Sequence, residues 1–571
     1  VPITPLYEYF PLGFKTLQRF LTDRGHKVEI ANISSLLLKY PGLDLEALLQ
    51  AAEVRLFGID LHWMVHVQGS LALAALVKRL HPGIPIVFGG MSATYFAHEL
   101  IRYPAVDLVM RGYDTHEPMA ALLDALKGDR NLAGVPNLLW KTASGQVMDN
   151  GLTHAPGRLE VGVDWSNIPR ADPREVLPIC ELLSTQSVGC AHNCGWCGGS
   201  RAAFQRVYGS RRHLVHKTRT AIRSEFETLR RSPDADAYHL YAVGSYNETK
   251  DRFRLFLDRV AESNLKSVSY ECFYLPPDVV LRDMVRAHPR TVITLSPESH
   301  DLRVARLAGR GVYTQDEMER WIERALDCGI HQIDVWYFIG MPEQNEASVF
   351  ATVDYCHKLL RRFRGRRVVP LLCPMIPFLD PASSFFEDPE RHGYRVFYRT
   401  LEEHRRGMMR ASLIHRINYE TRWLSRADLV RVGYTTVRRL TEIKGEVGLL
   451  PAGLAESVIA RIDDALRFIE VVHAVDEIAD EKTRLRELER IGEEIRRRND
   501  EVFFSGVANQ AVPILRKAGG RWFDEIPWDA RALEAANEPL SSGSGTSIAD
   551  CGLRIADFQG NKPRPSARIL R

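Results

Sequence analysis

The chain has 571 residues, of which 45% are hydrophobic and 26% are charged, and its formal net charge is +3. This length predicts three or four domains, and the composition is that of a globular protein. The small net charge argues against a nucleic-acid surface, and the sequence has neither an apolar run long enough for a membrane span nor a secretory leader. Nine cysteines are too few for a disulfide scaffold in so long a chain, and they fit a reducing, cytoplasmic compartment.

The first 130 residues alternate between helical and strand-like patterns. Helices are expected over 12–24, 70–80 and 117–126, and strands over 27–33, 54–60, 85–90 and 106–110. Short apolar runs that alternate with helices predict a parallel, doubly wound sheet. Such a sheet usually opens with a strand, and none precedes the first helix. We therefore expect the sequence to lack the first strand of this domain.

Glycines follow several of these expected strands, where they let a flat ligand approach the backbone closely. Gly89, Gly90 and Ser92 end one strand, and Gly112 follows the next. Together with the Pro-Leu-Gly segment that opens the first helix, this pattern resembles the cobalamin-binding Rossmann-like domain found ahead of many radical S-adenosylmethionine (SAM) barrels. The resemblance implies that residues 1–130 bind cobalamin and that these four residues contact it.

A histidine follows the expected strand 54–60. Some cobalamin proteins supply a lower cobalt ligand from the motif Asp-x-His-x-x-Gly, and Asp60-Leu-His62-Trp63-Met-Val65 matches it only in part, because the glycine is absent. The segment also follows a later strand than in that motif. We therefore assign no histidine–cobalt bond. The resemblance places His62 and Trp63 against the corrin, and the alternative for His62 is a hydrogen-bonded loop residue.

Residues 131–180 are predicted to connect two domains. A polar turn at 144–145 between strand-like runs at 136–140 and 146–148 predicts a hairpin. A proline-rich stretch then predicts a linker up to residue 180.

Three cysteines fall within eight residues, immediately after a strand-like segment at 182–188: Cys190, Cys194 and Cys197. Cysteine thiolates bind iron–sulfur clusters and zinc, and both normally take four ligands. With no fourth cysteine nearby, the trio leaves one coordination position open. The alternative is a zinc site completed by a histidine, although zinc sites more often use two separated ligand pairs. The candidate histidines are His192, His213 and His216.

The Cys-x3-Cys-x2-Cys spacing, with the aromatic Trp196 before the last cysteine, resembles the signature of the radical SAM superfamily. The resemblance implies that Cys190, Cys194 and Cys197 bind three irons of a [4Fe-4S] cluster, that the fourth iron binds SAM, and that Trp196 lies in the SAM site. One electron, from a donor such as flavodoxin or ferredoxin, then splits SAM to a 5′-deoxyadenosyl radical.

Residues 181–394 show a regular alternation of strands and helices. Strands are expected over 182–188, 238–243, 267–273, 290–296, 331–338 and 367–373, and helices over 214–232, 252–263, 277–288, 315–329 and 346–363. Six such units predict a parallel barrel or partial barrel with active residues at the carboxyl ends of the strands. The radical SAM fold is a partial barrel of this kind, with the cluster loop after its first strand.

Further polar segments follow the later strands of this barrel, and by resemblance they contact SAM. These candidate SAM-binding residues are Gly244 and Ser245 after the second strand, Ser296 and Glu298 after the fourth, and Ile339 and Met341 after the fifth. The alternative for each segment is helix capping or loop solvation. The guanidinium of Arg201 or Arg206 is a candidate to neutralise the negative charge of the cluster or of a carboxylate. The alternative is that both side chains are exposed at the surface. Met375, Phe378 and Asp380, in a loop after the barrel, are candidates for substrate contact.

The remaining sequence is predicted to form a mainly helical domain over 395–535, followed by a disordered tail over 536–571 that is too poor in apolar residues to pack a core. The complete pattern predicts a cobalamin-dependent radical SAM enzyme acting on a small-molecule or peptide substrate. C-methylation of an unactivated carbon is the first hypothesis. Cyclisation or rearrangement is the alternative chemistry, and a cobalamin- or metal-binding regulator with a structural cysteine site is the alternative class.

Overall fold

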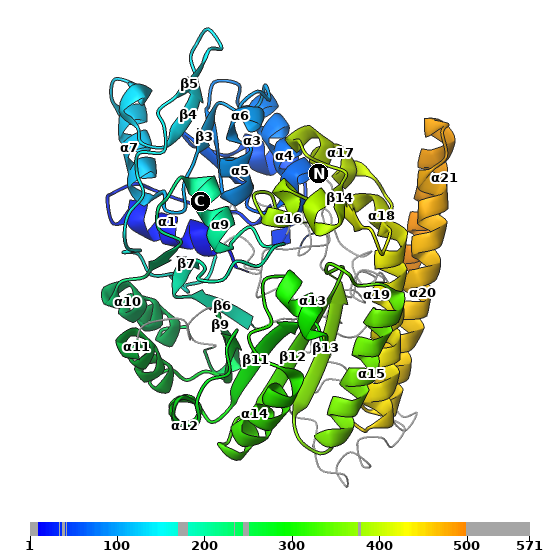
Figure 1. The fold of residues 1–571 in the computed structure, drawn as a ribbon. Helices are drawn as coiled ribbons and strands as arrows, with labels where there is room; N and C mark the ends of the chain where they lie inside the picture. Colours follow the sequence, from blue (N-terminus) through cyan, green and yellow to red (C-terminus); the bar gives the residue numbers. More distant parts are fainter. Residues whose placement is uncertain are drawn as a thin grey trace, which may run out of the picture.

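The computed structural model describes residues 10–33, 35–36, 40, 43–168, 181–232, 235–243, 250–374 and 379–497. In Figure 1 a blue-to-cyan N-terminal domain lies against a green domain with a large sheet, and yellow and orange helices cover one side of that sheet. Within the described residues, no helix is both long enough and apolar enough to cross a membrane.

The N-terminal domain is built on a five-stranded sheet in the order β1-β2-β3-β4-β5. Its strands are β1 (Phe57–Asp60), β2 (Ile86–Gly89), β3 (Leu108–Met110), β4 (Leu138–Lys141) and β5 (Val147–Asp149). The first three strands are parallel, as expected, and β4 and β5 continue the sheet in antiparallel register. The predicted hairpin therefore exists, but it extends this sheet and is not a separate connection.

Helices pack on this sheet. They are α1 (Leu12–Thr22), α3 (Leu45–Gln50), α4 (Val67–Leu80), α5 (Met91–Tyr95), α6 (Ala97–Leu100) and α7 (His116–Lys127). Of these, α1, α4 and α7 correspond to the three predicted over 12–24, 70–80 and 117–126, whereas α3, α5 and α6 were not predicted. Helix α4 buries Val67, Leu71, Ala74 and Val77, which recur at the three-to-four-residue spacing of one helical face. This face packs in the same apolar core as Ile86 and Phe88 of β2.

The predicted strand over 27–33 is wrong. Val28 and Ile30 alternate with charged residues, which imitates a strand pattern, but the two apolar side chains pack against different hydrophobic cores. The backbone carbonyl of Val28 accepts a hydrogen bond from the side chain of Gln18, through Nε2, at 2.9 Å.

The second domain contains the predicted six-stranded parallel sheet, in the order β13-β12-β11-β10-β9-β6. The strands are β6 (Glu181–Thr185), β9 (His239–Val243), β10 (Ser267–Cys272), β11 (Thr291–Glu298), β12 (Gln332–Ile339) and β13 (Val368–Pro374). Their helices are α10 (Arg219–Arg230), α11 (Lys250–Ala261), α12 (Asp278–Ala287), α13 (Leu302–Leu307), α14 (Gln315–Asp327) and α15 (Glu346–Arg362). All residues of β11 are buried, as expected for a parallel strand covered on both faces.

The predicted first strand, 182–188, is divided in the structure. Strand β6 ends at Thr185, and a separate β7 (Ser187–Gly189) pairs antiparallel with β8 (Leu214–His216). Helix α9 (Arg201–Tyr208) lies between β7 and β8, and α10 begins at Arg219 with Thr218 as its cap, not at the predicted 214. The three cysteines thus lie on the loop that follows β7 of this two-stranded ribbon.

The region after the barrel is mainly helical, as predicted. It contains α16 (Ser384–Glu387), α17 (Leu401–Met409), α18 (Leu413–Arg416), α19 (Arg426–Glu446), α20 (Ala452–Asp476) and α21 (Glu481–Arg497), with a short ribbon of β14 (Tyr394–Val396) and β15 (Tyr419–Thr421). Helix α19 packs on α15, β13 and α20. The predicted tail over 536–571 and the end of the helical domain lie outside the described residues.

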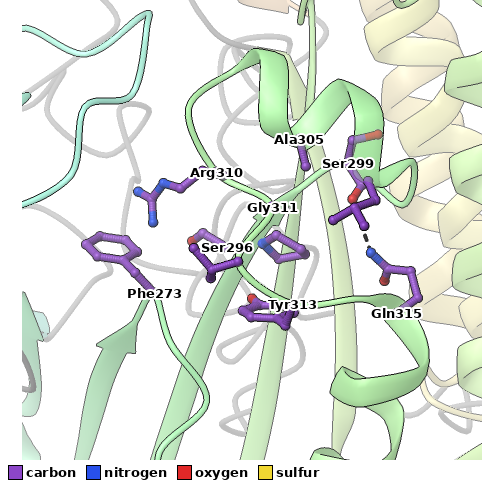
Figure 2. Close-up of a pocket in the computed structure, with 11 residues that line it drawn as sticks. Phe273, Ser296, Ser299, Ala305, Arg310, Gly311, Tyr313 and Gln315 are labelled. Carbon is purple, nitrogen blue, oxygen red and sulfur yellow. Dashed lines mark hydrogen bonds between the residues drawn. The ribbon is translucent and has the colours of Figure 1, made fainter.

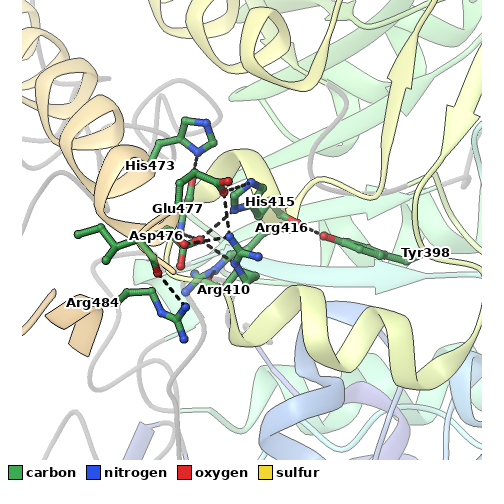
Figure 3. Close-up of polar contacts among 10 residues, drawn as sticks. Tyr398, Arg410, His415, Arg416, His473, Asp476, Glu477 and Arg484 are labelled. Carbon is green, nitrogen blue, oxygen red and sulfur yellow. Dashed lines mark hydrogen bonds and ion pairs between the residues drawn. The ribbon is translucent and has the colours of Figure 1, made fainter. Parts of the chain in front are cut away.

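A polar network joins α18 to the end of α20 (Figure 3). The buried carboxylate of Asp476 accepts hydrogen bonds from Arg410 Nε at 3.0 Å and His415 Nδ1 at 2.9 Å. Arg410 Nη2 also donates to Glu477 Oε1 at 3.0 Å. The guanidinium thereby balances two carboxylates at the junction of these helices.

A buried ion pair fixes the start of the barrel. Lys217 contacts Glu225 of α10, and the side chains are only 4% and 1% exposed. Glu225 also accepts a hydrogen bond from Ser184 Oγ of β6 at 2.8 Å. Because a buried charge without its partner is costly, this network ties β6, β8 and α10 together.

Replacing Glu225 with glutamine should therefore destabilise the barrel by about 3–5 kcal/mol, since it leaves the Lys217 ammonium buried without a counter-charge. The matched control is Asp251→Asn, which removes the exposed partner of Arg219, where the side chains are 58% and 81% exposed. Thermal unfolding checks both variants. Equal melting temperatures for the two variants would contradict the role assigned to Glu225.

Candidate functional site

The cluster loop, residues 190–200, follows β7 and leads into α9. Its entry is fixed by Cys190 N, which donates to His213 O at 2.9 Å, and its exit by Ser200, whose side chain caps α9. Cys194 is buried, Cys190 and Cys197 are partly buried, and all three are free thiols. The loop therefore presents three potential thiolate ligands from a fixed backbone.

A guanidinium that the sequence analysis did not identify contacts this loop. Arg310, after α13, donates from Nε to Cys194 Sγ at 2.9 Å and lies 3.2 Å from Glu298 Oε1. Its Cζ is 3.6 Å from the centroid of the Phe273 ring, toward which Figure 2 shows it pointing. The expected arginines do not fill this role, since Arg201 is exposed and Arg206 donates to the Ala382 carbonyl.

The approach of Arg310 depends on the glycine before it. Gly309 has φ +89°, and a Cβ there would lie 2.6 Å from Asn193 O of the cluster loop. One residue earlier, the carbonyl of Ala308 accepts from Gly195 N at 3.0 Å. In the sequence, only the Gly-Arg-Gly segment at 309–311 pointed to a close backbone contact. The segment did not indicate that its partner is the cluster loop.

Burial governs the protonation of the cysteines. It raises the pKa of Cys194 to about 11 and that of Cys197 well above its usual range, while Arg310 lowers the pKa of Cys194. The uncharged thiols are therefore favoured in the free protein, and metal binding must release their protons.

Glu298 is the most unusual residue near the loop. It has a left-handed backbone, with φ +68°, and its side chain is fully buried. Neither carboxylate oxygen has a hydrogen-bond partner among the described residues, and Arg310 Nη1 also lacks one. Burial raises the pKa of Glu298 to about 7, although Arg310 lowers it. Backbone strain and unsatisfied buried polar atoms mark functional sites more often than ordinary core.

A small pocket adjoins Glu298 and Arg310, between the end of β11 and α13. Figure 2 shows Ser296, Tyr313 and Gln315 around it, together with Arg310 and Phe273. Gln315 Nε2 closes one side by donating to Ser299 O at 3.2 Å. The structure therefore brings Ser296, Arg310 and the neighbouring Glu298 to the same mouth as Cys194.

The other candidate SAM residues are placed differently. The Trp196 ring packs on Phe338 near the end of β12, with centroids 5.5 Å apart. Ile339 and Met341 lie close by in sequence, but both side chains are fully buried in the hydrophobic core. Gly244 and Ser245 lie outside the described residues, as do Met375 and Phe378.

The candidate cobalamin residues gather at the carboxyl ends of β1, β2 and β3. Ser92 Oγ donates to His62 O at 2.7 Å, which joins the first two strand ends, and Gly112 N donates to Thr94 Oγ1 at 3.2 Å. Burial lowers the pKa of His62 to about 4, so its imidazole is neutral, whereas Trp63 is 45% exposed. Gly89 ends β2 opposite Asp60.

These strand ends reach the cluster loop at Gly198. A Cβ on Gly198 would lie 3.0 Å from Met91 Cε and 3.0 Å from Asp380 Cβ. Gly198 N donates to Asp380 Oδ2 at 2.8 Å. The β2–α5 turn of the N-terminal domain and the segment after the barrel therefore meet the loop directly beside Cys197.

The three cysteine sulfurs do not all lie within 4.8 Å of one another. Two ligands of one zinc ion, with Zn–S near 2.3 Å, are at most about 4.6 Å apart. Among the described residues, the group whose ligand atoms all lie within 4.8 Å of one another is His415, His473 and Glu477, where Arg410 supplies the cationic partner. The cysteine trio does not form so compact a group, with or without the nearby histidines.

Comparison with known families agrees with this geometry. Residues 2–122 match the B12 binding domain family, and residues 185–356 match the Radical SAM superfamily. No curated protein matches the chain.

Two solved structures share the architecture. One is the radical SAM methyltransferase TsrM from Kitasatospora setae with cobalamin and a [4Fe-4S] cluster bound, at 16% identity and a TM-score of 0.56 over 76% of this chain and 88% of that one. The other is the cobalamin-dependent SAM radical enzyme OxsB with aqua-cobalamin and SAM bound, at 12% identity and a TM-score of 0.53 over 93% and 81% of the respective chains. At these identities the likeness concerns the fold.

The chain is thus a radical SAM protein with an N-terminal cobalamin-binding domain. Its cofactors are a [4Fe-4S] cluster, SAM and cobalamin. This confirms the predicted fold class and cofactor set.

Replacing Gly195 with alanine should disrupt the cluster loop, because a Cβ there would lie closer than 3.0 Å to three ring atoms of the buried Phe385. Overpacking of this kind costs about 1–3 kcal/mol, so iron content after anaerobic reconstitution should fall clearly below the wild-type value. Gly199→Ala is the control in the same loop, since its nearest neighbour would be Cys197 Sγ at an ordinary 3.6 Å. Full iron content in the Gly195 variant would contradict the tight packing of this loop.

Proposed function

We propose that the protein transfers a methyl group to an unactivated carbon of a small-molecule or peptide substrate. The observation that carries the proposal is the junction at Gly198, where the cobalamin-domain turn at Met91 lies against the cluster loop. A substrate carbon between the two cofactor sites would be within reach of both. When bound, the cofactors supply electron transfer, a carbon radical and the methyl group, and the protein supplies orientation and exclusion of water.

In this proposal, Cys190, Cys194 and Cys197 bind three irons, and Arg310 offsets negative charge beside Cys194. The unsatisfied carboxylate of Glu298 accepts hydrogen bonds from SAM, for which its hydroxyl and ammonium groups are suitable donors. Ser296 and Trp196 line the same mouth, and Ile339 and Met341 support it from the core.

The N-terminal strand ends hold the corrin. Gly90 and Gly112, with φ of +110° and +125°, let the backbone approach a flat ring, and Gly89 and Ser92 complete this surface. The exposed Trp63 offers a stacking face, and the neutral imidazole of the partly buried His62 contacts the Trp63 ring, with centroids 5.1 Å apart. A reduced flavodoxin or ferredoxin is the proposed electron donor.

Methylation is favoured over rearrangement by one structural relative, because TsrM is a methyltransferase whose structure contains a tryptophan substrate. Cyclisation or rearrangement remains the alternative chemistry on the same cofactor set. A regulator with a structural cysteine site is the alternative class.

The test uses the anaerobically reconstituted protein with cobalamin, SAM and a reductant. We expect about four irons per chain, and release of S-adenosylhomocysteine together with 5′-deoxyadenosine. Replacing any one of the three cluster-loop cysteines with alanine should abolish both products, whereas Cys328→Ala, a partly buried cysteine on another element, should retain them. 5′-Deoxyadenosine alone would favour rearrangement, and zinc without either product would favour the regulator.

Replacing Gly90 with alanine should weaken cobalamin binding. A Cβ there would lie 2.8 Å from backbone atoms of Leu61 and His62, at a φ that side chains rarely adopt. Strain of this size costs about 1–3 kcal/mol, so the dissociation constant for hydroxocobalamin should rise by roughly tenfold or more. Absorbance titration measures it, with Gly83→Ala as control because nothing lies within 4 Å of its Cβ. Unchanged affinity in the Gly90 variant would argue against the proposed corrin surface.

A further inference from the structure

The segment that follows the barrel, residues 379–387, runs along the cluster loop and bonds to it repeatedly. Asp380 N donates to Trp196 O at 3.2 Å, and Phe385 N donates to Gly195 O at 2.8 Å. In the opposite direction, Gly198 N donates to Asp380 Oδ2 at 2.8 Å. The stretch from Gly195 to Gly198 is therefore held by one neighbour on both sides of Cys197.

The same 379–387 segment is anchored away from the loop. The buried side chain of Asn418 bonds both backbone groups of Leu379, at 2.9 Å and 3.1 Å. At its other end, Glu387 Oε1 accepts from Tyr95 OH of the N-terminal domain at 2.7 Å. The segment thus connects the cluster loop to both the cobalamin-binding domain and the C-terminal region.

Asp380 is the charged member of this segment. Its carboxylate accepts a hydrogen bond from the amide of Gly198 at 2.8 Å. Burial raises its pKa to about 6, and the Gly198 N–H lowers it, so the carboxylate is ionised at mildly alkaline pH. The amide that this carboxylate accepts from belongs to Gly198, the residue directly after Cys197.

We propose that Asp380 is a positioning residue for the reaction: it fixes the turn after Cys197 through the Gly198 amide and places a negative charge beside the cluster. The inference rests on the proposed function, in which Cys197 binds a cluster iron. Two effects follow. The fixed turn determines where the open iron faces SAM, and the charge makes the cluster harder to reduce, because net charge and hydrogen bonding near a cluster set its reduction potential.

Two substitutions separate these effects. Asp380→Asn keeps an acceptor oxygen for Gly198 N–H but removes the charge. Asp380→Ala removes both the acceptor and the charge. Asp388→Asn is the matched control, since Asp388 belongs to the same stretch of chain but is exposed and its backbone N–H bonds only Ser384 O.

The experiment uses the full chain, reconstituted with iron and sulfide and loaded with cobalamin. Redox titration followed by electron paramagnetic resonance gives the midpoint potential, and the change of the reduced-cluster signal on addition of SAM gives the SAM dissociation constant. Cobalamin absorbance and thermal unfolding report whether each variant is folded.

In Asp380→Asn we expect wild-type iron content, a higher midpoint potential and SAM affinity within about twofold of wild type. In Asp380→Ala we expect the potential to rise as well and the SAM dissociation constant to increase by roughly tenfold, the effect of losing one hydrogen bond to a charged group. Asp388→Asn should match the wild type in both quantities.

A wild-type midpoint potential in Asp380→Asn overturns the inference, and this isosteric variant decides the matter even if Asp380→Ala does not fold. Failure of the wild-type protein itself to take up about four irons would instead refute the proposed function. The two failures are distinguishable. The first concerns the midpoint potential of a variant, and the second concerns the iron content of the wild-type protein.

Discussion

The structure depends on holding the three cysteines of the cluster loop in place. A loop of eleven residues (190–200) has no secondary structure to fix it, so its neighbours must do so. Gly195 packs against Phe385, Asn193 against Gly309, and Gly198 against both Met91 and Asp380. These contacts come from the barrel, the segment after it and the N-terminal domain. Cluster geometry is therefore a property of the whole fold and not of the cysteine motif alone.

Charged groups beside this loop are also paired. Glu298 and Arg310 are both buried, and Arg310 also donates to Cys194. Burial of such charged groups in a low-dielectric site destabilises the folded protein unless a bound ligand completes their hydrogen bonds. The unsatisfied oxygens of Glu298 are then understood as part of a site prepared for a polar molecule, at a cost to the stability of the free protein. The strained backbone of Glu298 agrees with this interpretation.

The sequence predicted what depends on local pattern. The cysteine spacing identified the cluster loop, and alternating apolar runs predicted the parallel strands of both sheets. The alternation of apolar and polar residues at 27–33 led to a wrong strand prediction. Val28 and Ile30 pack against two different hydrophobic cores. The division of the first barrel strand near Gln186 was also missed, since both halves are equally strand-like.

Long-range contacts in the site could not be predicted. Arg310 lies 116 residues from Cys194, and Asp380 lies 182 residues from Gly198. No periodicity connects such positions, and only the folded barrel brings their loops together. The sequence suggests a substrate contact for Asp380, whereas in the structure its carboxylate accepts a hydrogen bond from the cluster loop.

One iron of the four-iron cluster should have no protein sulfur and be free to bind SAM. Mössbauer spectroscopy of the ⁵⁷Fe-reconstituted protein tests it most directly, because it reports each iron site separately. Adding SAM should change the spectrum of one iron and leave the other three unchanged. A spectrum that does not respond to SAM, or a protein that incorporates no iron, would contradict it.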